Sequence, residues 1–174
     1  LPIKQFIKKE EKWFERHVKF TNFTKPKYVD VLFDMKKFEK KIKFKISHEQ
    51  KFIEYSPLTM NYFKTITKKI EFNNGGILII DYGYLNKKIK NTLQAVTNHK
   101  YSSVLDNFGK SDITYNLNFY LIEKIIKQFG SFNSITTTQK KFLISLGILQ
   151  RAEILTKNIA FTKKADIYFR IKRL

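Results

Sequence analysis

One apolar stretch constrains the fold more than any other part of the sequence. Residues 77–80 are four consecutive branched aliphatic side chains, preceded by Gly75-Gly76 and followed by Asp81-Tyr82-Gly83. A run without a polar face predicts a strand at 76–81 that is covered on both sides, as in a parallel sheet flanked by helices. Asp81 would then lie at the carboxyl end of this strand, where open α/β sheets bind their ligands. The alternative is a solvated turn that ends a buried strand.

Three segments before this stretch alternate between polar and apolar residues. The alternation covers residues 13–20, 28–33 and 41–46. Short strands with one wet face fit this pattern, so we expect an antiparallel patch in the first 50 residues. Residues 1–12 show no clear period.

Helical periodicity begins after Ser56-Pro57 and predicts a helix at 57–71, because apolar residues recur there every four positions. A second apolar stripe over 121–129 ends at Gly130, and Thr138 can cap a third helix. The remaining segments are assigned more coarsely: a strand at 131–137, a loop over 85–116 with a helical turn at 92–95, and an ambiguous basic tail from 156.

The chain has 174 residues, no cysteine and a net charge of +19. This length fits one domain or part of a larger one. Arginine occurs at only four positions, and the lysines are scattered over the whole chain. Surfaces that grip phosphate usually rely on the bidentate arginine fork, so nucleic acid is not the expected partner. No segment has the length and apolar character of a membrane span, and no signal peptide is visible. The absence of cysteine is compatible with the cytoplasm, which is the location we expect.

Few residues carry an obvious chemistry. The three histidines lack the spacing of a zinc site, so no metal is expected, and no Gly-x-Gly turn is present to approach a nucleotide-like cofactor. Glu54 precedes a predicted helix, where it could serve catalysis or simply favour the helix end. His99 follows the polar segment 92–95, where site residues often lie; the alternative is ordinary loop polarity. For Asp112, in segment 112–114, the alternative is a turn that starts a helix at 117.

Taken together and in order, these motifs resemble a known family. It is the family of S-adenosylmethionine-dependent methyltransferases that includes the mitochondrial complex I assembly factor with protein-arginine methyltransferase activity, and its bacterial relatives. The segments that carry the resemblance are 1–6, Trp13 with Glu15-Arg16, Glu54 with Ser56-Pro57, Gly75-Gly76 with 80–83, 92–95 with His99, 112–114, 138–147 and Arg151.

The resemblance implies a fold and a set of site residues. The expected fold is α/β: a partial Rossmann-like class I methyltransferase domain, with an antiparallel insertion at 1–50 and the C-terminal half of the sheet at 51–174. Glu54 and Asp81 would hold and orient the arginine guanidinium. The residues expected to bind the substrate are Tyr82, Gln94, His99 and Asp112.

The resemblance also has a clear gap. The family's glycine-rich cofactor loop and the Asn-Glu-Phe-Phe-Asp-Ala segment before Leu-Pro have no counterpart here. We therefore expect a C-terminal portion that does not bind S-adenosylmethionine alone, its cofactor-binding residues remaining unassigned. Its expected partner is the missing N-terminal half of the domain or a protein substrate. A basic nucleic-acid-binding module and a catalytically dead protein-interaction remnant remain as alternatives.

Overall fold

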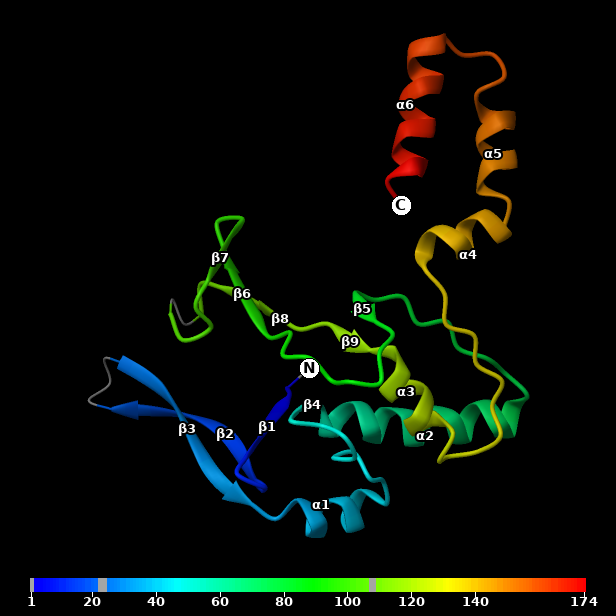
Figure 1. Ribbon diagram of the computed structural model, residues 1–174. Coiled ribbons are helices and arrows are strands. Elements are labelled where there is room, and N and C mark those ends of the chain that lie inside the picture. The colour runs from blue at the N-terminus through cyan, green and yellow to red at the C-terminus, as the bar shows by residue number, and fades with distance from the viewer. Residues whose placement is uncertain (1, 22–24, 107–108) are drawn as a thin grey trace. The chain divides into compact units, whose positions relative to one another are not determined.

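The computed structural model describes residues 2–21, 25–106 and 109–174. The chain divides into two compact units, Leu1–Phe132 and Asn133–Leu174. The first unit is mixed α/β and contains every strand described; the second consists of helices (Figure 1). The mixed α/β class predicted from the sequence is therefore confirmed.

A four-stranded antiparallel sheet forms the main framework of the first unit. Its strands are β1 (Lys4–Lys9), β2 (Lys12–Thr21), β3 (Lys25–Phe33) and β4 (Phe52–Tyr55), in the spatial order β3-β2-β1-β4. β2 and β3 match the alternation seen at 13–20 and 28–33. β1 and β4 were not predicted, and β4 carries the sheet past residue 50.

Two smaller sheets complete the strands of this unit. β5 (Gly83–Tyr84) pairs in parallel with β9 (Leu117–Asn118), whereas β6 (Gln94–Thr97) lies between β7 (Lys100–Ser102) and β8 (Asp112–Thr114) in an antiparallel sheet. The segment 85–116, expected to be mainly loop with a helical turn at 92–95, thus contains three strands. Residues 94 and 95 belong to a strand, so the helical turn was wrong.

The helices of the first unit cover one face of the main sheet. They are α1 (Met35–Ile42), α2 (Pro57–Asn73) and α3 (Phe119–Ile126). The predicted helix at 57–71 is confirmed: the Ser56 side chain accepts a hydrogen bond from the Thr59 amide, and Pro57 occupies the first turn. The stripe over 121–129 is helical as far as Ile126.

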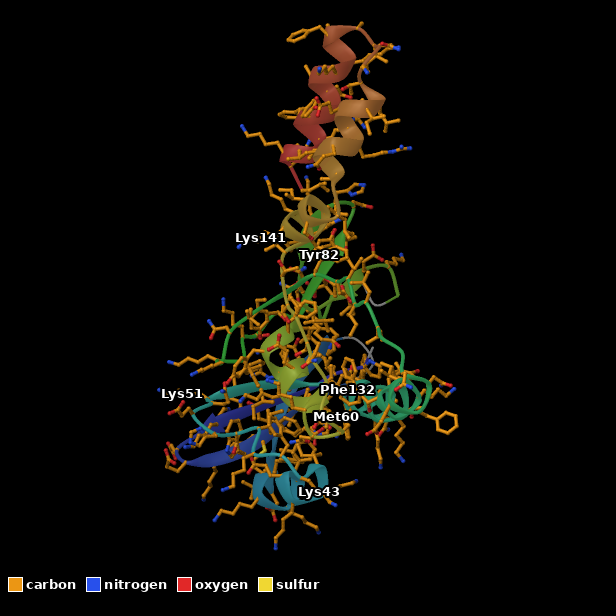
Figure 2. All side chains as sticks on the ribbon, turned by 90° about the vertical axis from the view of Figure 1, so that its right-hand side faces the viewer. Lys43, Lys51, Met60, Tyr82, Phe132 and Lys141 are labelled. Atoms are coloured by element: carbon orange, nitrogen blue, oxygen red, sulfur yellow. The ribbon has the colours of Figure 1, made fainter. Side chains whose placement is uncertain are left out.

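The core lies between the sheet and these helices. The Phe6 ring is fully buried, with its centroid 4.6 Å from that of Phe33 and 5.4 Å from that of Phe38. Phe38 makes an edge-on contact with Tyr55. Met60, labelled in Figure 2, joins the same buried cluster from α2. Because Phe38 belongs to α1, this core depends on a helix that was not predicted from the sequence.

The strand predicted at 41–46 is wrong. Residues 41 and 42 end α1, whose apolar residues Met35, Phe38 and Ile42 follow a helical spacing and face the core. Asp34 caps the start of this helix by accepting from the Lys37 amide. Lys43 then adopts the left-handed conformation, with φ of 55°, and ends the helix.

The buried strand predicted at 76–81 is also wrong. This segment has no regular secondary structure. Ile77, Leu78 and Ile80 are 50%, 63% and 66% exposed, so three of the four aliphatic side chains face solvent. A strand needs a neighbouring strand to pair with. Among the described residues, the segment 76–81 has no such neighbour, and pairing begins only with the short β5 that follows it.

The second unit contains α4 (Gln139–Ser145), α5 (Ile148–Leu155) and α6 (Phe161–Lys172). Thr138 caps α4 as predicted, because its side chain accepts from the Lys141 amide. The strand expected at 131–137 is wrong, since these residues are irregular. The tail from 156, left ambiguous by the sequence, is largely helical.

Candidate functional site

Glu54 is the most firmly held carboxylate among the predicted site residues. It lies in β4, opposite Gln5 of β1, and is buried. Its Oε1 accepts hydrogen bonds from Gln5 Nε2 at 2.9 Å, from the Thr92 amide at 3.0 Å and from the Leu93 amide at 3.1 Å. Its Oε2 accepts from the Thr92 hydroxyl at 2.6 Å. Four donors therefore fix the orientation of this carboxyl group.

The Thr92 hydroxyl extends this network to a third segment. It donates to Glu54 and accepts from the Asn116 amide at 3.0 Å. Glu54 and Thr92 thereby join β4, the entrance to β6 and the residues before β9. The carboxylate is a structural link between distant parts of the chain, in addition to any role in catalysis.

A small pocket opens beside Glu54. Its volume is about 40 Å³, which is enough for a few water molecules and too little for a peptide side chain in its present form. The residues that line it combine hydroxyl, amide and carboxylate groups on an aliphatic floor: Glu54, Tyr55, Ser56, Thr59, Tyr84, Ile89, Tyr115, Asn116, Leu117, Asn118, Leu121, Ile122 and Ile125.

Two tyrosines of the pocket carry perturbed phenols. Burial raises the pKa of Tyr115, and the Asp81 and Glu54 carboxylates raise it further, against the lowering effect of the Thr59 and Ser56 hydroxyls. Burial also raises the pKa of Tyr84, whose oxygen accepts from the Lys90 amide at 2.9 Å. Both phenols remain protonated donors at neutral pH.

Asp81 and Glu54, predicted as a pair, both raise the pKa of the Tyr115 phenol. Of the two carboxylates, Glu54 lines the pocket together with Tyr115. Asp81 itself is exposed, and its Oδ1 accepts from the Tyr82 amide at 2.7 Å. The Tyr82 side chain is 85% exposed and is labelled in Figure 2, while its carbonyl accepts from the Leu117 amide at 3.0 Å. Tyr82 thus contacts the site through its backbone.

Gln94, His99 and Asp112 belong to the same small sheet, with Gln94 at the start of β6, His99 in the turn after β6 and Asp112 at the start of β8. Gln94 Nε2 donates to the Thr114 hydroxyl at 3.1 Å across the strand pair, and Asp112 lies opposite Val96. Asn98 and His99 form the hairpin turn, with φ of 50° and 63°, as a type I′ turn requires. Within the described part of the chain, no hydrogen bond joins any of the three predicted residues to Glu54 or Asp81.

Sequence reasoning missed the partners that organise the site. Gln5 faces Glu54 only because β1 and β4 are neighbours, and neither strand was predicted. Tyr115 and Asn116 follow the recognised segment 112–114 but carried no signal of their own. Their proximity to Glu54 depends on contacts between distant segments, which a single sequence does not display.

The glycines of the chain do not form a cradle for a nucleotide-like cofactor. A Cβ added at Gly83 would lie 2.4 Å from the Leu117 carbonyl oxygen and 2.5 Å from the Phe119 ring, so this glycine serves the packing of β5 on β9. Gly75 and Gly76 have open space around them. Together with the small pocket, this means that the described residues do not fit S-adenosylmethionine.

The described residues lack two further kinds of feature. No three His, Asp or Glu side chains gather in a way that could hold a metal ion. Likewise, none of the helices in the described ranges combines the length and apolar character that crossing a membrane requires.

Comparison with known proteins identifies the family. The model of the family described as "Putative S-adenosyl-L-methionine-dependent methyltransferase" matches residues 1–137. The chain belongs to this family. The resemblance found in the sequence motifs is thereby confirmed.

Two curated relatives are similar over part of their length. The protein arginine methyltransferase NDUFAF7 of Xenopus tropicalis is 28% identical over 103 residues, which are 59% of this chain and 24% of the relative. The NDUFAF7 homolog of Caenorhabditis elegans is 28% identical over 162 residues, 87% of this chain and 36% of the relative. The chain thus spans about a quarter to a third of these relatives.

Two solved structures share the fold. An uncharacterized COG1565 superfamily protein from Burkholderia thailandensis superimposes with a TM-score of 0.71 at 18% identity, over 95% of this chain and 46% of that one. A superfamily member from the same organism, bound to S-adenosyl-homocysteine, gives 0.69 at 18% identity over 96% and 45%. At this identity the likeness establishes the fold, and the chain corresponds to less than half of each structure.

Proposed function

We propose that this chain is the substrate-facing part of a methyltransferase that acts on arginine nitrogen in proteins. Family membership supports methyl transfer, and the names of the two curated relatives support arginine. The resemblance further implies a role in complex I assembly, and the bacterial relatives make the cytoplasm our proposed compartment.

In this proposal the chain contributes part of a Rossmann-like class I fold. The antiparallel sheet around β1–β3 is the insertion, and residues from 51 onward supply later elements of the central sheet. The exposure of Ile77, Leu78 and Ile80 supports this arrangement, because apolar segments left open in this way are usually covered by a partner. The partner proposed to cover them is the remainder of the methyltransferase domain.

The observation that carries the site assignment is the fixed carboxylate of Glu54 beside Tyr115. Carboxylates recognise guanidinium through paired, charge-assisted hydrogen bonds. Oε2 of Glu54 accepts one bond, from Thr92, which leaves a lone pair for a substrate N–H. Asp81 is exposed, and in this proposal it holds the second edge of the guanidinium. Tyr82, Gln94, His99 and Asp112 are proposed to contact the peptide around the arginine.

These 174 residues contain no Gly-x-Gly turn, so we propose that another segment supplies the cofactor loop and that the isolated chain is inactive. The test compares the chain alone with the chain coexpressed with the segment encoded immediately upstream in the same genome. Titration calorimetry with S-adenosyl-homocysteine should show no binding by the chain alone and clear binding by the complex. Micromolar binding by the chain alone would place the cofactor site within these residues.

Methyl transfer by the complex tests the two carboxylates. In Glu54→Gln and Asp81→Asn variants, transfer to an arginine peptide should fall at least tenfold while cofactor binding is kept, since positioning contributes factors of this size. Unchanged transfer in both variants would refute the assignment. A complex that transfers no methyl group but still binds a protein would favour the dead remnant. Tight RNA binding with a steep salt dependence would favour the nucleic-acid module.

A further inference from the structure

The outermost strand of the main sheet has an open edge. In the order β3-β2-β1-β4, β3 pairs with β2 on one side, and no other strand of the described residues pairs with it. Figure 1 shows β2 and β3 as a long, twisted pair of strands. An edge of this kind presents unpaired N–H and C=O groups to which another chain can pair.

Protection of this edge is confined to one end. Natural edge strands are usually blunted by lysine, proline or an unpaired charge. Pro26 and Lys27 lie at the tip of the β2–β3 hairpin, whereas residues 28–33, Tyr-Val-Asp-Val-Leu-Phe, contain neither type. Their one charge, Asp30, is engaged within the sheet by Lys9 at 2.8 Å and Arg16 at 3.2 Å. Six residues of good strand composition are thus left open.

Exposed apolar side chains accompany the open edge on both faces of β3. Val31 is 49% exposed and Leu32 66%, and as consecutive strand residues they point to opposite faces. Tyr28 is 39% exposed and carries the Arg16 guanidinium over its ring at 4.8 Å. An added strand could cover apolar surface above and below the sheet.

The tip of the hairpin is strongly basic. Lys19 and Lys27 are directly opposite each other on β2 and β3, and both are exposed. Like charges in this position destabilise a strand pair. Residues 16–29 hold four cations and no carboxylate, so the sequence itself offers no nearby compensation. A carboxylate from a partner beside this pair would relieve the repulsion.

From these observations we infer that the β3 edge docks an extended segment of a partner protein, which adds as a fifth antiparallel strand. Its apolar residues lie along 28–33, and its acidic carboxyl-terminal end lies beside Lys27, with Lys19 one strand further in, because an antiparallel strand places its C-terminus at the start of β3. Such strand addition takes its affinity from main-chain hydrogen bonds and its specificity from alternate side chains. A second copy of this chain is disfavoured, since each copy carries +19.

This surface lies outside the pocket, and the inference stands apart from methyl transfer. The β3 edge and the pocket nevertheless share the main sheet. One row of paired residues crosses its four strands, in the order Glu54, Gln5, Arg16 and Asp30. A partner bound at β3 would be held on the same framework that fixes Glu54.

The test uses a labelled ten-residue peptide in which six alternating Val and Thr residues precede four Glu residues. The chain is immobilised at low density, and binding is measured by a biosensor. The control peptide has the same sequence with the Val and Thr backbone nitrogens methylated, which keeps the charge and removes the main-chain donors. Methylation should weaken binding at least tenfold. Equal binding of both peptides would reduce the interaction to net charge and overturn the inference.

A pair of charge variants tests the position of the acidic end. Lys19→Glu with Lys27→Glu should weaken binding of the unmodified peptide at least tenfold. Lys163→Glu with Lys164→Glu, an equal charge change on exposed residues of α6, should change it less than twofold. Equal losses in both variants would also overturn the proposal, as would sedimentation showing that copies of the chain pair through β3 and exclude the peptide. If the first variant fails to fold, the peptide comparison on the unmodified chain still decides.

Discussion

At the scale of single residues, Glu54 combines a structural and a functional role. Its carboxylate accepts from donors on β1 and on residues 92–93. Replacing it by glutamine exchanges one acceptor oxygen for a donor that faces the Thr92 hydroxyl. Since hydrogen bonds to charged groups contribute about 1.5–3 kcal/mol, we expect Glu54→Gln to lower the free energy of unfolding by about 1–3 kcal/mol, measured by urea unfolding.

The matched control for this substitution is Glu71→Gln. Glu71 is exposed on α2, where exchanges of this kind usually change stability by less than about 0.5 kcal/mol. If both variants unfold at the same urea concentration as the unmodified chain, Glu54 does not hold β4 to residues 92–93. Loss of methyl transfer in Glu54→Gln must therefore be judged on protein whose folding has been checked.

Tyr55 predicts a pH dependence of stability. Burial raises the pKa of its phenol from 10.0 to about 12. The protonated form is favoured by folding, so this contribution is complete below pH 10 and is lost as the pH rises from 10 toward 12. At about 1.4 kcal/mol per pKa unit, the loss is at most about 3 kcal/mol. Between pH 9 and pH 11.5, the free energy of unfolding should therefore fall more for the unmodified chain than for the Tyr55→Phe variant. An equal fall in both proteins would show that Tyr55 does not contribute to the pH dependence.

At the scale of elements, Gly83 fixes the pairing of β5 with β9. Any Cβ at this position would overlap the Leu117 carbonyl and the Phe119 ring, and a backbone atom cannot move aside as a side chain can. We expect Gly83→Ala to destabilise the chain by about 1–3 kcal/mol, the usual cost of overpacking. Gly75→Ala is the control: it meets nothing within 4 Å and should be neutral or slightly stabilising. Thermal melting compares the two, and equal melting temperatures would contradict the packing argument.

The same elements show what the sequence could predict. The helix after Ser56-Pro57 was found because its cap, its proline and its apolar period lie within one stretch. The alternation at 41–46 was a local pattern too, but α1 prevailed because Met35, Phe38 and Ile42 bury a helical stripe in the core. Asp34, which caps α1, is the sequence signal from which this helix could have been predicted.

The candidate site was predictable only in its outline. Family motifs pointed to Glu54 and to the segment 92–95, and the structure brings them together through Thr92. Gln5 and Tyr115 became visible only with the fold, since they reach Glu54 through pairing of distant segments. The strand predicted for the aliphatic run at 77–80 was wrong for the same reason. Composition can indicate that a segment favours the strand conformation, but the strand forms only where a neighbouring strand pairs with it.

At the scale of the whole molecule, that exposed run predicts self-association. Ile77, Leu78 and Ile80 are exposed on either side of Ile79, which packs against the core, and exposed apolar patches bind partners or aggregate. The net charge of +19 opposes self-association at low salt. Sedimentation at a salt concentration that screens this charge should therefore show association of the isolated chain that grows with protein concentration. Replacing all three residues by serine should shift the chain toward the monomer. Its melting temperature should change little, because the three side chains lie outside the buried core.

A matched triple variant separates this segment from apolar exposure in general. Leu146, Ile154 and Phe161 in the helical unit are 67%, 66% and 82% exposed, and changing them to serine should leave the association largely intact.

The proposal that another segment completes the domain gives a second prediction for the serine variant at 77, 78 and 80. In coexpression with the upstream segment, the serine variant at 77, 78 and 80 should fail to form the one-to-one complex, since the partner would cover these positions. A chain that remains monomeric at all concentrations, or a serine variant that still assembles, would show that residues 77–80 are not the contact.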